Sequence, residues 1–249
     1  MDISKLESGN YQLFIEIRNR QKQLLSQKVV EFVRSNPYLE VTHEEMKEVK
    51  IEDEFVVKLT RKELRYSLKA IAPLVKEGDV ELLNSVIANK DSTVQQRFLF
   101  NFWANQNPNR PDVTYEAFMR IARAVDKTYA SGFGYGFESD RGYTYIRYGQ
   151  PDDIIKVDND PSAPPYEIWF YNDFPMTSQS DVKFLFYSPD LASSYQLLHS
   201  TARGERNNPQ WELELYRNVP NEIEGSNYVD GTKMQDNWFR FASRYFNEN

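Results

Sequence analysis

The sequence predicts an α+β fold, in which a helical subdomain of about four helices packs on an antiparallel β-meander and an N-terminal β-strand annex precedes both. Apolar residues recur at helical spacing through residues 60–131, whereas apolar and polar residues alternate along most of residues 142–200. Shorter alternating runs lie before residue 60. We therefore expect an N-terminal β-rich segment at 1–59 and a larger domain at 60–249.

The annex is predicted from alternation. Apolar side chains occupy every second position of residues 11–17, which indicates a half-buried strand, and residues 28–33 are its expected partner across a polar turn. The short apolar run at residues 54–59 predicts one more strand.

Start and stop signals divide residues 60–131 into helices. Thr60 and Glu63 match a capping box, and Pro73 is expected to kink or end the helix that follows. A second helix is expected at 79–88, a third from a similar box at 92–95, and a fourth from Pro111 to the Ser131-Gly132 stop.

From residue 142 the apolar and polar residues alternate with a period of two, which predicts β-strands. The connections between these strands are too short for helical crossovers, so we expect an antiparallel meander. Near the C-terminus, Met234, Trp238, Phe241 and Tyr245 are spaced as on a helix, expected at about 232–246. Residues 238–246 also fit a strand. The meander strands are expected at 143–148, 166–171, 182–187 and 195–199.

Composition excludes several classes of function. The formal net charge of −7, with no basic block, argues against binding nucleic acid. The chain has no cysteine, which removes thiol nucleophiles, disulfides and Cys-based zinc sites. The chain contains no run of about 18 apolar residues, so the sequence predicts no transmembrane segment. Residues 1–6 have neither the basic start nor the apolar run of a signal peptide.

Residues 136–152 look like a signature. We expect a tight turn in which Asp140 caps backbone N–H groups, Gly142 adopts a positive φ, and Arg141 pairs internally, with Asp152 as the candidate partner. The alternative is that Asp140 and Arg141 are exposed and contact a ligand. Turn chemistry accounts for each residue type and favours the first interpretation.

Two neighbouring features have open alternatives. Glycine alternates with aromatic residues at 132–137, which indicates either a bend that inserts Phe133 and Phe137 into the core or a surface that stacks on sugars. The long segment 149–165 contains Asp152, Asp153 and the acidic stretch 158–160. It is a solvated acidic turn or a cation-binding loop, although it lacks the spacing of an EF-hand.

No catalytic constellation is found in the sequence, and no cofactor is expected. His43 begins a segment that superficially resembles the zinc protease motif, but Lys47 stands where its second His is required. His199 is followed by hydroxyl residues that face the other side of a strand, so it is expected to be structural.

The signature resembles the GWxTD domain, a module of Bacteroidota envelope proteins. Gly136, Phe137, Ser139 and Asp140 stand in the naming motif, although Phe137 replaces its Trp and Ser139 replaces its Thr. Upstream, Asn107 stands where the family has Asp, which argues against any role that needs a charged side chain at position 107. The other matching residues are Arg141, Gly142, Tyr145, Gly149, Pro151, Asp152 and, on a later strand, Trp169.

The resemblance implies a place outside the cytoplasm, in the periplasm or at the outer membrane, and no established activity. We therefore expect a non-enzymatic structural or interaction module that binds a protein partner in the cell envelope. The alternative is a carbohydrate- or peptidoglycan-binding module with weak or vestigial hydrolase chemistry. That chemistry would require Asp140 and Asp152 to face each other across a cleft.

Overall fold

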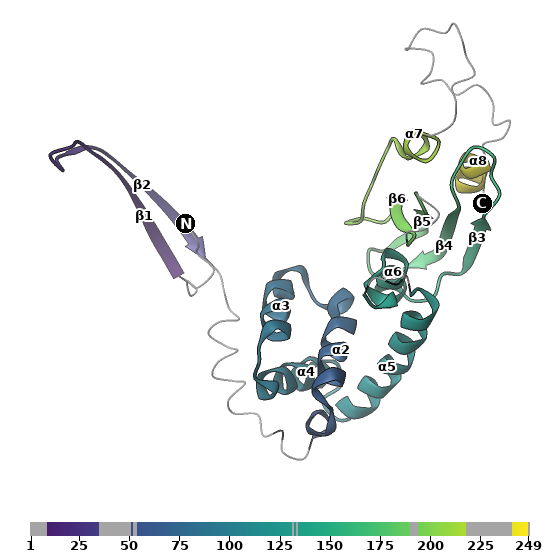
Figure 1. Cartoon of the computed structure of the whole chain (residues 1–249), viewed down its shortest axis with the longest axis horizontal. Coiled ribbons are helices and arrows are strands. Elements are labelled where there is room, and N and C mark those ends of the chain that lie inside the picture. The colour runs from purple at the N-terminus through teal and green to yellow at the C-terminus, as the bar shows by residue number, and fades with distance from the viewer. Residues whose placement is uncertain are drawn as a thin grey trace, which may run out of the picture. The chain divides into compact units, whose positions relative to one another are not determined.

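Figure 1 shows the computed structural model of the chain, which describes residues 9–34, 51, 54–130, 132, 134–189, 194–217 and 241–248. These residues form helices together with two antiparallel sheets, one of two strands and one of four. The predicted α+β fold class is therefore confirmed. The chain divides into two compact units, Met1–Tyr115 and Glu116–Asn249. The domain limit expected between residues 59 and 60 stays a prediction.

Strands β1 (Gly9–Arg18) and β2 (Leu24–Arg34) form an antiparallel hairpin, as the alternation predicted. The turn between them is held by Asn19, whose Oδ1 accepts hydrogen bonds from the N–H groups of Gln21 and Gln23. Such a side-chain bond to the following backbone is a common way to fix a turn. The hairpin register therefore follows from local sequence.

Residues 54–59 do not form the short strand predicted for them, because Phe55–Lys58 is a 3₁₀ helix, η1. Val56 is fully buried, and the Phe55 ring lies 4.7 Å from the Tyr115 ring between centroids. An apolar run this short fits either structure. The contact of Phe55 with Tyr115, a residue far along the chain, favours the helical turn over the strand.

Helix α2 (Arg61–Ala70) begins at the predicted capping box. The Thr60 side chain accepts a hydrogen bond from the Glu63 N–H, and the Glu63 carboxylate accepts one from the Thr60 N–H at 2.8 Å. Pro73 lies beyond the helix in a short 3₁₀ helix, η2 (Ala72–Leu74), since proline lacks the N–H that would continue α2. Both predictions are confirmed.

Three further helices lie where the helical spacing placed them. One cap differs from the expected one, because Asp91 rather than Ser92 is the N-cap of the helix over residues 92–106. The Asp91 carboxylate accepts a hydrogen bond from the Thr93 N–H at 2.8 Å. Ser92 is the first helical residue instead. The elements are η3 (Glu77–Asp79), α3 (Val80–Ala88), α4 (Ser92–Gln106) and α5 (Pro111–Thr128).

Helix α6 (Asp140–Tyr148) replaces the strand predicted over residues 143–148, so that prediction was wrong. A 3₁₀ helix, η4 (Gly136–Glu138), precedes it. Ser139 caps the start of α6, and Gly149 ends it with a φ of 86°, which glycine adopts without strain. Caps at both ends outweigh the alternating pattern between them.

The strands after α6 form one antiparallel meander in the order β3-β4-β5-β6. The sheet occupies 153–200 rather than the predicted 142–200, since its first strand lies inside the segment that was expected to be a loop. Lys156 of that strand is paired with Glu167 of the next. The strands are β3 (Asp153–Val157), β4 (Tyr166–Phe174), β5 (Gln179–Tyr187) and β6 (Gln196–Ser200).

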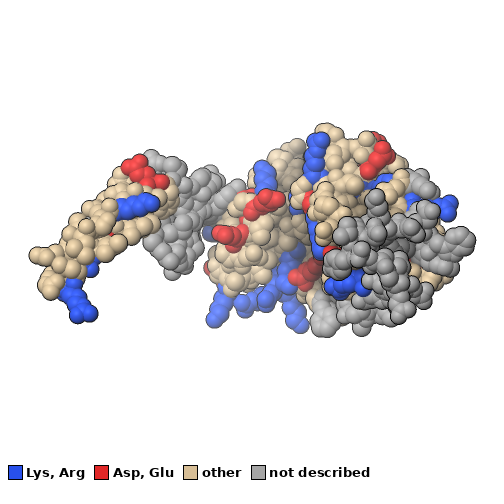
Figure 2. All heavy atoms as spheres, turned by 90° about the horizontal axis from the view of Figure 1, so that it is seen from above, with Lys and Arg blue, Asp and Glu red and all other residues tan. Residues whose placement is uncertain are grey.

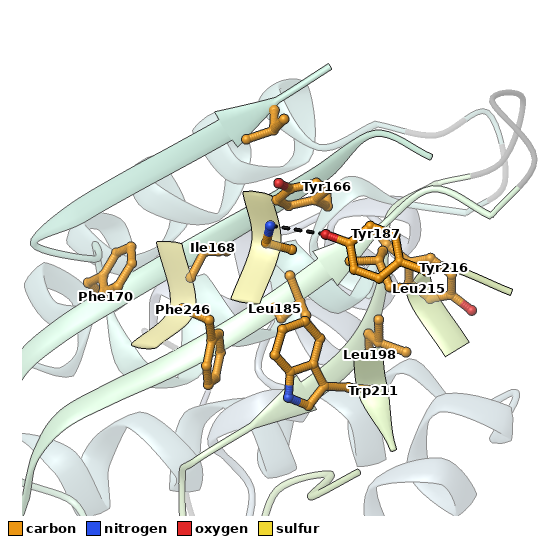
Figure 3. Packing of buried hydrophobic residues seen from close by; sticks show 12 residues of the cluster. Tyr166, Ile168, Phe170, Leu185, Tyr187, Leu198, Trp211, Leu215, Tyr216 and Phe246 are labelled. Atoms are coloured by element: carbon orange, nitrogen blue, oxygen red, sulfur yellow. Dashed lines mark hydrogen bonds between the residues drawn. The ribbon is translucent and has the colours of Figure 1, made fainter. Parts of the chain in front are cut away.

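The two faces of this sheet carry different clusters. On one face, an apolar cluster joins the strands to α7 (Trp211–Leu215) and α8 (Phe241–Glu248), as Figure 3 shows. On the other face, aromatic rings pack against one another, with the Trp169 and Phe186 centroids 4.9 Å apart. The meander is therefore buried on both faces.

Helix α8 confirms the expected C-terminal helix from residue 241 onward, and the strand alternative fails for residues 241–246. Residues 232–240 of that prediction lie outside the described residues. No helix among the described residues combines the length and apolar composition that crossing a bilayer requires.

Candidate functional site

The signature glycines allow two backbone segments to come together. The Gly136 N–H donates to Asp126 Oδ1 at 2.6 Å, and a Cβ on Gly136 would lie 2.2 Å from the Asp126 carbonyl oxygen. A Cβ on Gly142 would lie 2.0 Å from the Gly136 carbonyl oxygen. Gly142 is helical and has no positive φ, so the expected reason for this glycine was wrong. It is required for close packing.

The helix cap predicted for Asp140 is provided by Ser139, and Asp140 has a different partner. Ser139 Oγ accepts a hydrogen bond from the Gly142 N–H at 3.2 Å and therefore caps α6. The Asp140 carboxylate instead accepts a hydrogen bond from the Leu197 N–H of β6 at 2.6 Å. Asp140 thus ties the start of α6 to an edge strand of the sheet.

Arg141 pairs with Glu167 of β4, not with Asp152 as predicted. Its Nη1 donates to Glu167 Oε1 at 2.9 Å, and the two side chains are only 16% and 5% exposed. Glu167 also receives a hydrogen bond on Oε2 from Trp169 Nε1 at 3.0 Å and faces Lys156 Nζ at 3.3 Å. One carboxylate therefore holds three donors, the arrangement that a buried charge needs.

Two tyrosine rings enclose the guanidinium. The Arg141 Cζ lies 4.0 Å from the Tyr195 ring centroid and 5.2 Å from that of Tyr129, within the range of cation–π attraction. Burial, and then the charge of Glu167, raise the pKa of Tyr129 to about 12, so its hydroxyl stays neutral at physiological pH. We call Arg141, Glu167, Lys156, Trp169, Tyr129 and Tyr195 the Arg141 cluster.

The end of the signature leads directly into strand β3 of the sheet. The Gly149 carbonyl accepts a hydrogen bond from the Tyr171 hydroxyl at 3.0 Å, and Pro151 is buried. Asp152 donates its N–H to the Phe170 carbonyl at 2.8 Å, and its carboxylate accepts the Asn172 N–H at 2.7 Å. These contacts align β3 with β4.

The aromatic residues of the signature are core residues. Phe137 is 1% exposed and stacks on Tyr135, in agreement with the predicted bend, while Phe133 lies outside the described residues. Tyr145 packs edge-on against the fully buried Trp169, with centroids 6.4 Å apart. The signature thus joins α6 to the sheet through packing as well as hydrogen bonds.

The carboxylates considered for chemistry have backbone or hydroxyl partners. Asp140 and Asp152 each accept a hydrogen bond from a backbone N–H, on β6 and β4 respectively. In the acidic stretch, Asp158 accepts from the Tyr195 hydroxyl at 3.5 Å, and Asp160 is buried beside Tyr166 and Tyr216. No three His, Cys, Asp or Glu side chains gather as a metal site within the described part of the chain.

The other residues considered have structural contacts where they are described. Asn107 uses both ends of its amide, since Oδ1 accepts from the Arg110 N–H at 3.2 Å and Nδ2 donates to Thr114 Oγ1 at 3.1 Å. An aspartate could not donate the second bond. His199 accepts from the Asn208 N–H at 3.0 Å, and burial lowers its pKa. His43 lies outside the described residues.

Glu167, Tyr129 and Tyr195 were not expected as partners of Arg141. Glu167 carried a usable signal, because it lies two residues before Trp169 on a strand and therefore shares a face with it. A carboxylate between apolar neighbours on a buried strand needs a cation. The two tyrosines carried no such signal, because only the folded chain brings residues 129, 141 and 195 together.

No family model matches the chain, and neither curated protein sequences nor solved structures give a significant match.

Proposed function

We propose that the chain is a non-enzymatic interaction module that binds a protein partner through the β1–β2 hairpin. The observation that carries the proposal is a row of exposed apolar side chains on this hairpin. The exposed fractions of Ile15, Ile17 and Leu25 are 46%, 59% and 65%. Apolar side chains at this density on one element are typical of a surface that another protein covers.

The register places Ile15 and Ile17 on one face, whereas Leu25 is the residue without a partner at the register shift. Residues that are directly opposite in an antiparallel pair share a face, so Tyr11 with Phe32 and Leu13 with Val30 extend the row that contains Ile15. The Tyr11 and Phe32 rings are stacked, with centroids 5.7 Å apart. In Figure 2 the hairpin surface is mostly tan, with few charged side chains.

The opposite face is more polar, although it also carries the pair Phe14 and Val29, which are 54% and 44% exposed. It carries the hydrogen-bonded pair Gln12 and Glu31, at 2.7 Å, and the ion pair of Glu16 with Arg18, at 2.6 Å. A two-stranded hairpin is only marginally stable by itself in water. A partner that covers the apolar face would stabilise the hairpin and bury its exposed side chains.

The signature contributes rigidity to this module rather than chemistry. Within the described residues, Asp140, Arg141 and Asp152 form hydrogen bonds with strands β6 and β4. The GWxTD resemblance adds the location, and we propose that the partner belongs to an assembly of the bacterial cell envelope.

A comparison of two lysine variants tests the hairpin surface. Ile15→Lys puts a charge on the apolar face, whereas Gln27→Lys puts the same charge on the opposite face, beside Glu16. With the wild-type chain as bait, chemical cross-linking in envelope extracts should recover a stable partner, which Gln27→Lys retains and Ile15→Lys loses. Equal recovery with all three chains, or recovery of the bait alone, would contradict the proposal.

A measurement on the isolated chain checks whether the face is open. Methyl resonances of Ile15 and Ile17 should broaden strongly with a soluble paramagnetic probe and become protected when the partner binds. Protection of both methyls in the isolated chain would show that the chain covers this face itself.

A further inference from the structure

Helix α2 brings together basic side chains that form no continuous run in the sequence. At 3.6 residues per turn, its four basic positions lie within about 100° of one another around the helix axis. Leu64 and Leu68 are buried on another side of the helix. We call the row of basic residues the α2 basic face. Its residues are Arg61, Lys62, Arg65 and Lys69.

Most of the α2 basic face is exposed to solvent. Arg61, Lys62 and Arg65 are exposed, and Lys69 is half-buried. The side chains of Lys62 and Arg65 form neither a hydrogen bond nor an ion pair with a described residue. Glu63, the acidic residue of α2, is bound at the capping box. Figure 2 shows Lys and Arg side chains gathered along the lower edge of the helical part of the chain.

The positions of these cations are unfavourable for an isolated helix. Arg61 and Lys62 occupy the first two helical positions, where the positive pole of the helix disfavours a cation. Arg65 lies four residues from both Arg61 and Lys69, and like charges at this spacing repel each other. The Arg61 Nη2 donates to the Lys90 carbonyl at 3.3 Å, but Lys62 and Arg65 have no such compensation among the described residues. An anion outside the chain would relieve this repulsion.

The arrangement fits an extended anionic surface better than a single anion. Bidentate recognition of one phosphate or carboxylate needs a guanidinium that neighbouring groups hold in place, and no group in the described ranges holds that of Arg65. Directly before α2, Val57 is 43% exposed and is followed by the exposed Lys58. An exposed apolar residue beside cations favours the headgroup region of a bilayer over a polyanion in water.

We propose that the α2 basic face binds the surface of a membrane that contains anionic lipids. Each Lys or Arg near such a surface strengthens binding about fivefold, so four residues provide a weak and reversible attachment. The formal net charge of −7 means that the same lipids repel the rest of the chain. The chain should therefore attach with α2 toward the membrane. The proposal does not depend on the hairpin or on its protein partner.

Vesicle binding tests the proposal with the full chain. Vesicles of phosphatidylcholine, with and without phosphatidylglycerol, are sedimented with the protein at low salt. The wild-type chain should sediment only with vesicles that contain phosphatidylglycerol, and added salt should release it, because exposed charges are screened. The double variant Lys62→Glu, Arg65→Glu should bind on the order of twentyfold or more weakly. Equal binding of the two chains, or equal binding to both kinds of vesicle, would overturn the proposal.

A matched control separates the α2 basic face from net charge. Arg203→Glu with Arg217→Glu makes the same change in charge at exposed positions outside α2. This control chain should keep most of the wild-type binding. A loss as large as that of the α2 variant would show that only the net charge matters, and the assignment to α2 would fail.

Competition identifies the kind of anion. Polyglutamate and a DNA duplex are measured against the same vesicles at one salt concentration, and both should bind the wild-type chain more weakly than the vesicles do. Tighter binding to either one, lost in the Lys62→Glu, Arg65→Glu chain, would assign the face to an acidic protein or to nucleic acid and overturn the proposal.

Lysine acetylation of the wild-type chain locates the contact. Vesicles with phosphatidylglycerol should protect Lys62 and Lys69 from an amine-reactive reagent, as measured by mass spectrometry. Lys22, at the turn of the hairpin, and Lys156, whose side chain is 59% exposed, should react as before. Unchanged reaction of Lys62 and Lys69 in the vesicle-bound chain would show that another surface binds the lipid.

The variant chains are expected to fold, because an acidic residue in the first turn of a helix is favourable. Circular dichroism should show the same helix content and the same or a higher melting temperature for the Lys62→Glu, Arg65→Glu chain. If that chain does not fold, Lys62→Gln with Arg65→Gln, which only removes the two charges, takes its place. Undiminished vesicle binding by a folded variant of either kind would overturn the proposal.

Discussion

The hairpin β1–β2 and helix α6 begin from the same kind of pattern and end as different structures. Residues 11–17 and 143–148 both place large side chains at alternate positions, yet the first forms a strand and the second a helix. The helix has a serine cap at Ser139 and a glycine stop at Gly149. Capping groups at both ends decided between structures that the alternation alone could not separate.

The two regions also differ in where their side chains find partners. In the Arg141 cluster, a buried carboxylate and a half-buried guanidinium are paired within the chain. In the hairpin, apolar side chains such as Ile17 remain exposed to solvent. The first region therefore stabilises the fold, and the second is the surface that the proposed partner would cover. Changes in the cluster should thus alter stability, and changes in the hairpin should alter binding.

The largest expected effect is that of Gly142→Ala. The added Cβ would meet the Gly136 carbonyl oxygen at 2.0 Å and the Phe137 Cα at 2.7 Å, which are backbone atoms that cannot rotate away. We expect the free energy of unfolding to fall by about 4 kcal/mol, measured by urea denaturation. Gly78→Ala is the control, because nothing lies within 4 Å of its added Cβ. Equal losses in the two variants would contradict the close approach.

Glu167→Gln should have the next largest effect. It removes the anion that holds Arg141, Lys156 and Trp169 while keeping the shape of the side chain. We expect a loss of about 3 kcal/mol in the free energy of unfolding, because a half-buried guanidinium is left without its charge partner. Glu16→Gln, in an exposed ion pair of the hairpin, should change stability by less than about 1 kcal/mol. A similar small change for Glu167 would remove the contrast between the regions.

Arg141→Ala should cost less than the loss of Glu167, about 2 kcal/mol, because Lys156 and Trp169 still neutralise and bind the carboxylate. Combined with Glu167→Gln, it should add much less than its effect alone, which a double-mutant cycle would measure. An unchanged melting temperature together with lost partner binding would instead make Arg141 a recognition residue.

The smallest effect expected is a dependence on pH through His199. Burial lowers its pKa below the ordinary value of 6.5, so the unfolded chain takes up a proton before the native chain does. Stability should therefore decrease as the pH falls through 6.5. His199→Asn, which can still accept the Asn208 N–H, should show a weaker decrease between pH 7.5 and 5.5 in thermal denaturation. Parallel pH profiles for the two chains would contradict this role.

The sequence by itself determined the elements whose signals are local. The hairpin followed from alternation around a polar turn, and α2 from the Thr60 capping box and Pro73, because these groups act within a few residues of one another. The α+β class followed from the change of period along the chain.

Only the tertiary structure decided which partners these residues have. Sequence pointed to Asp152 as the partner of Arg141, but folding brought Glu167 to it, together with rings from positions 129 and 195. The folded structure likewise requires Gly142 for a close backbone contact rather than for a positive φ. A buried charge pairs with the nearest oppositely charged group in space, and proximity in space is not written in the local pattern.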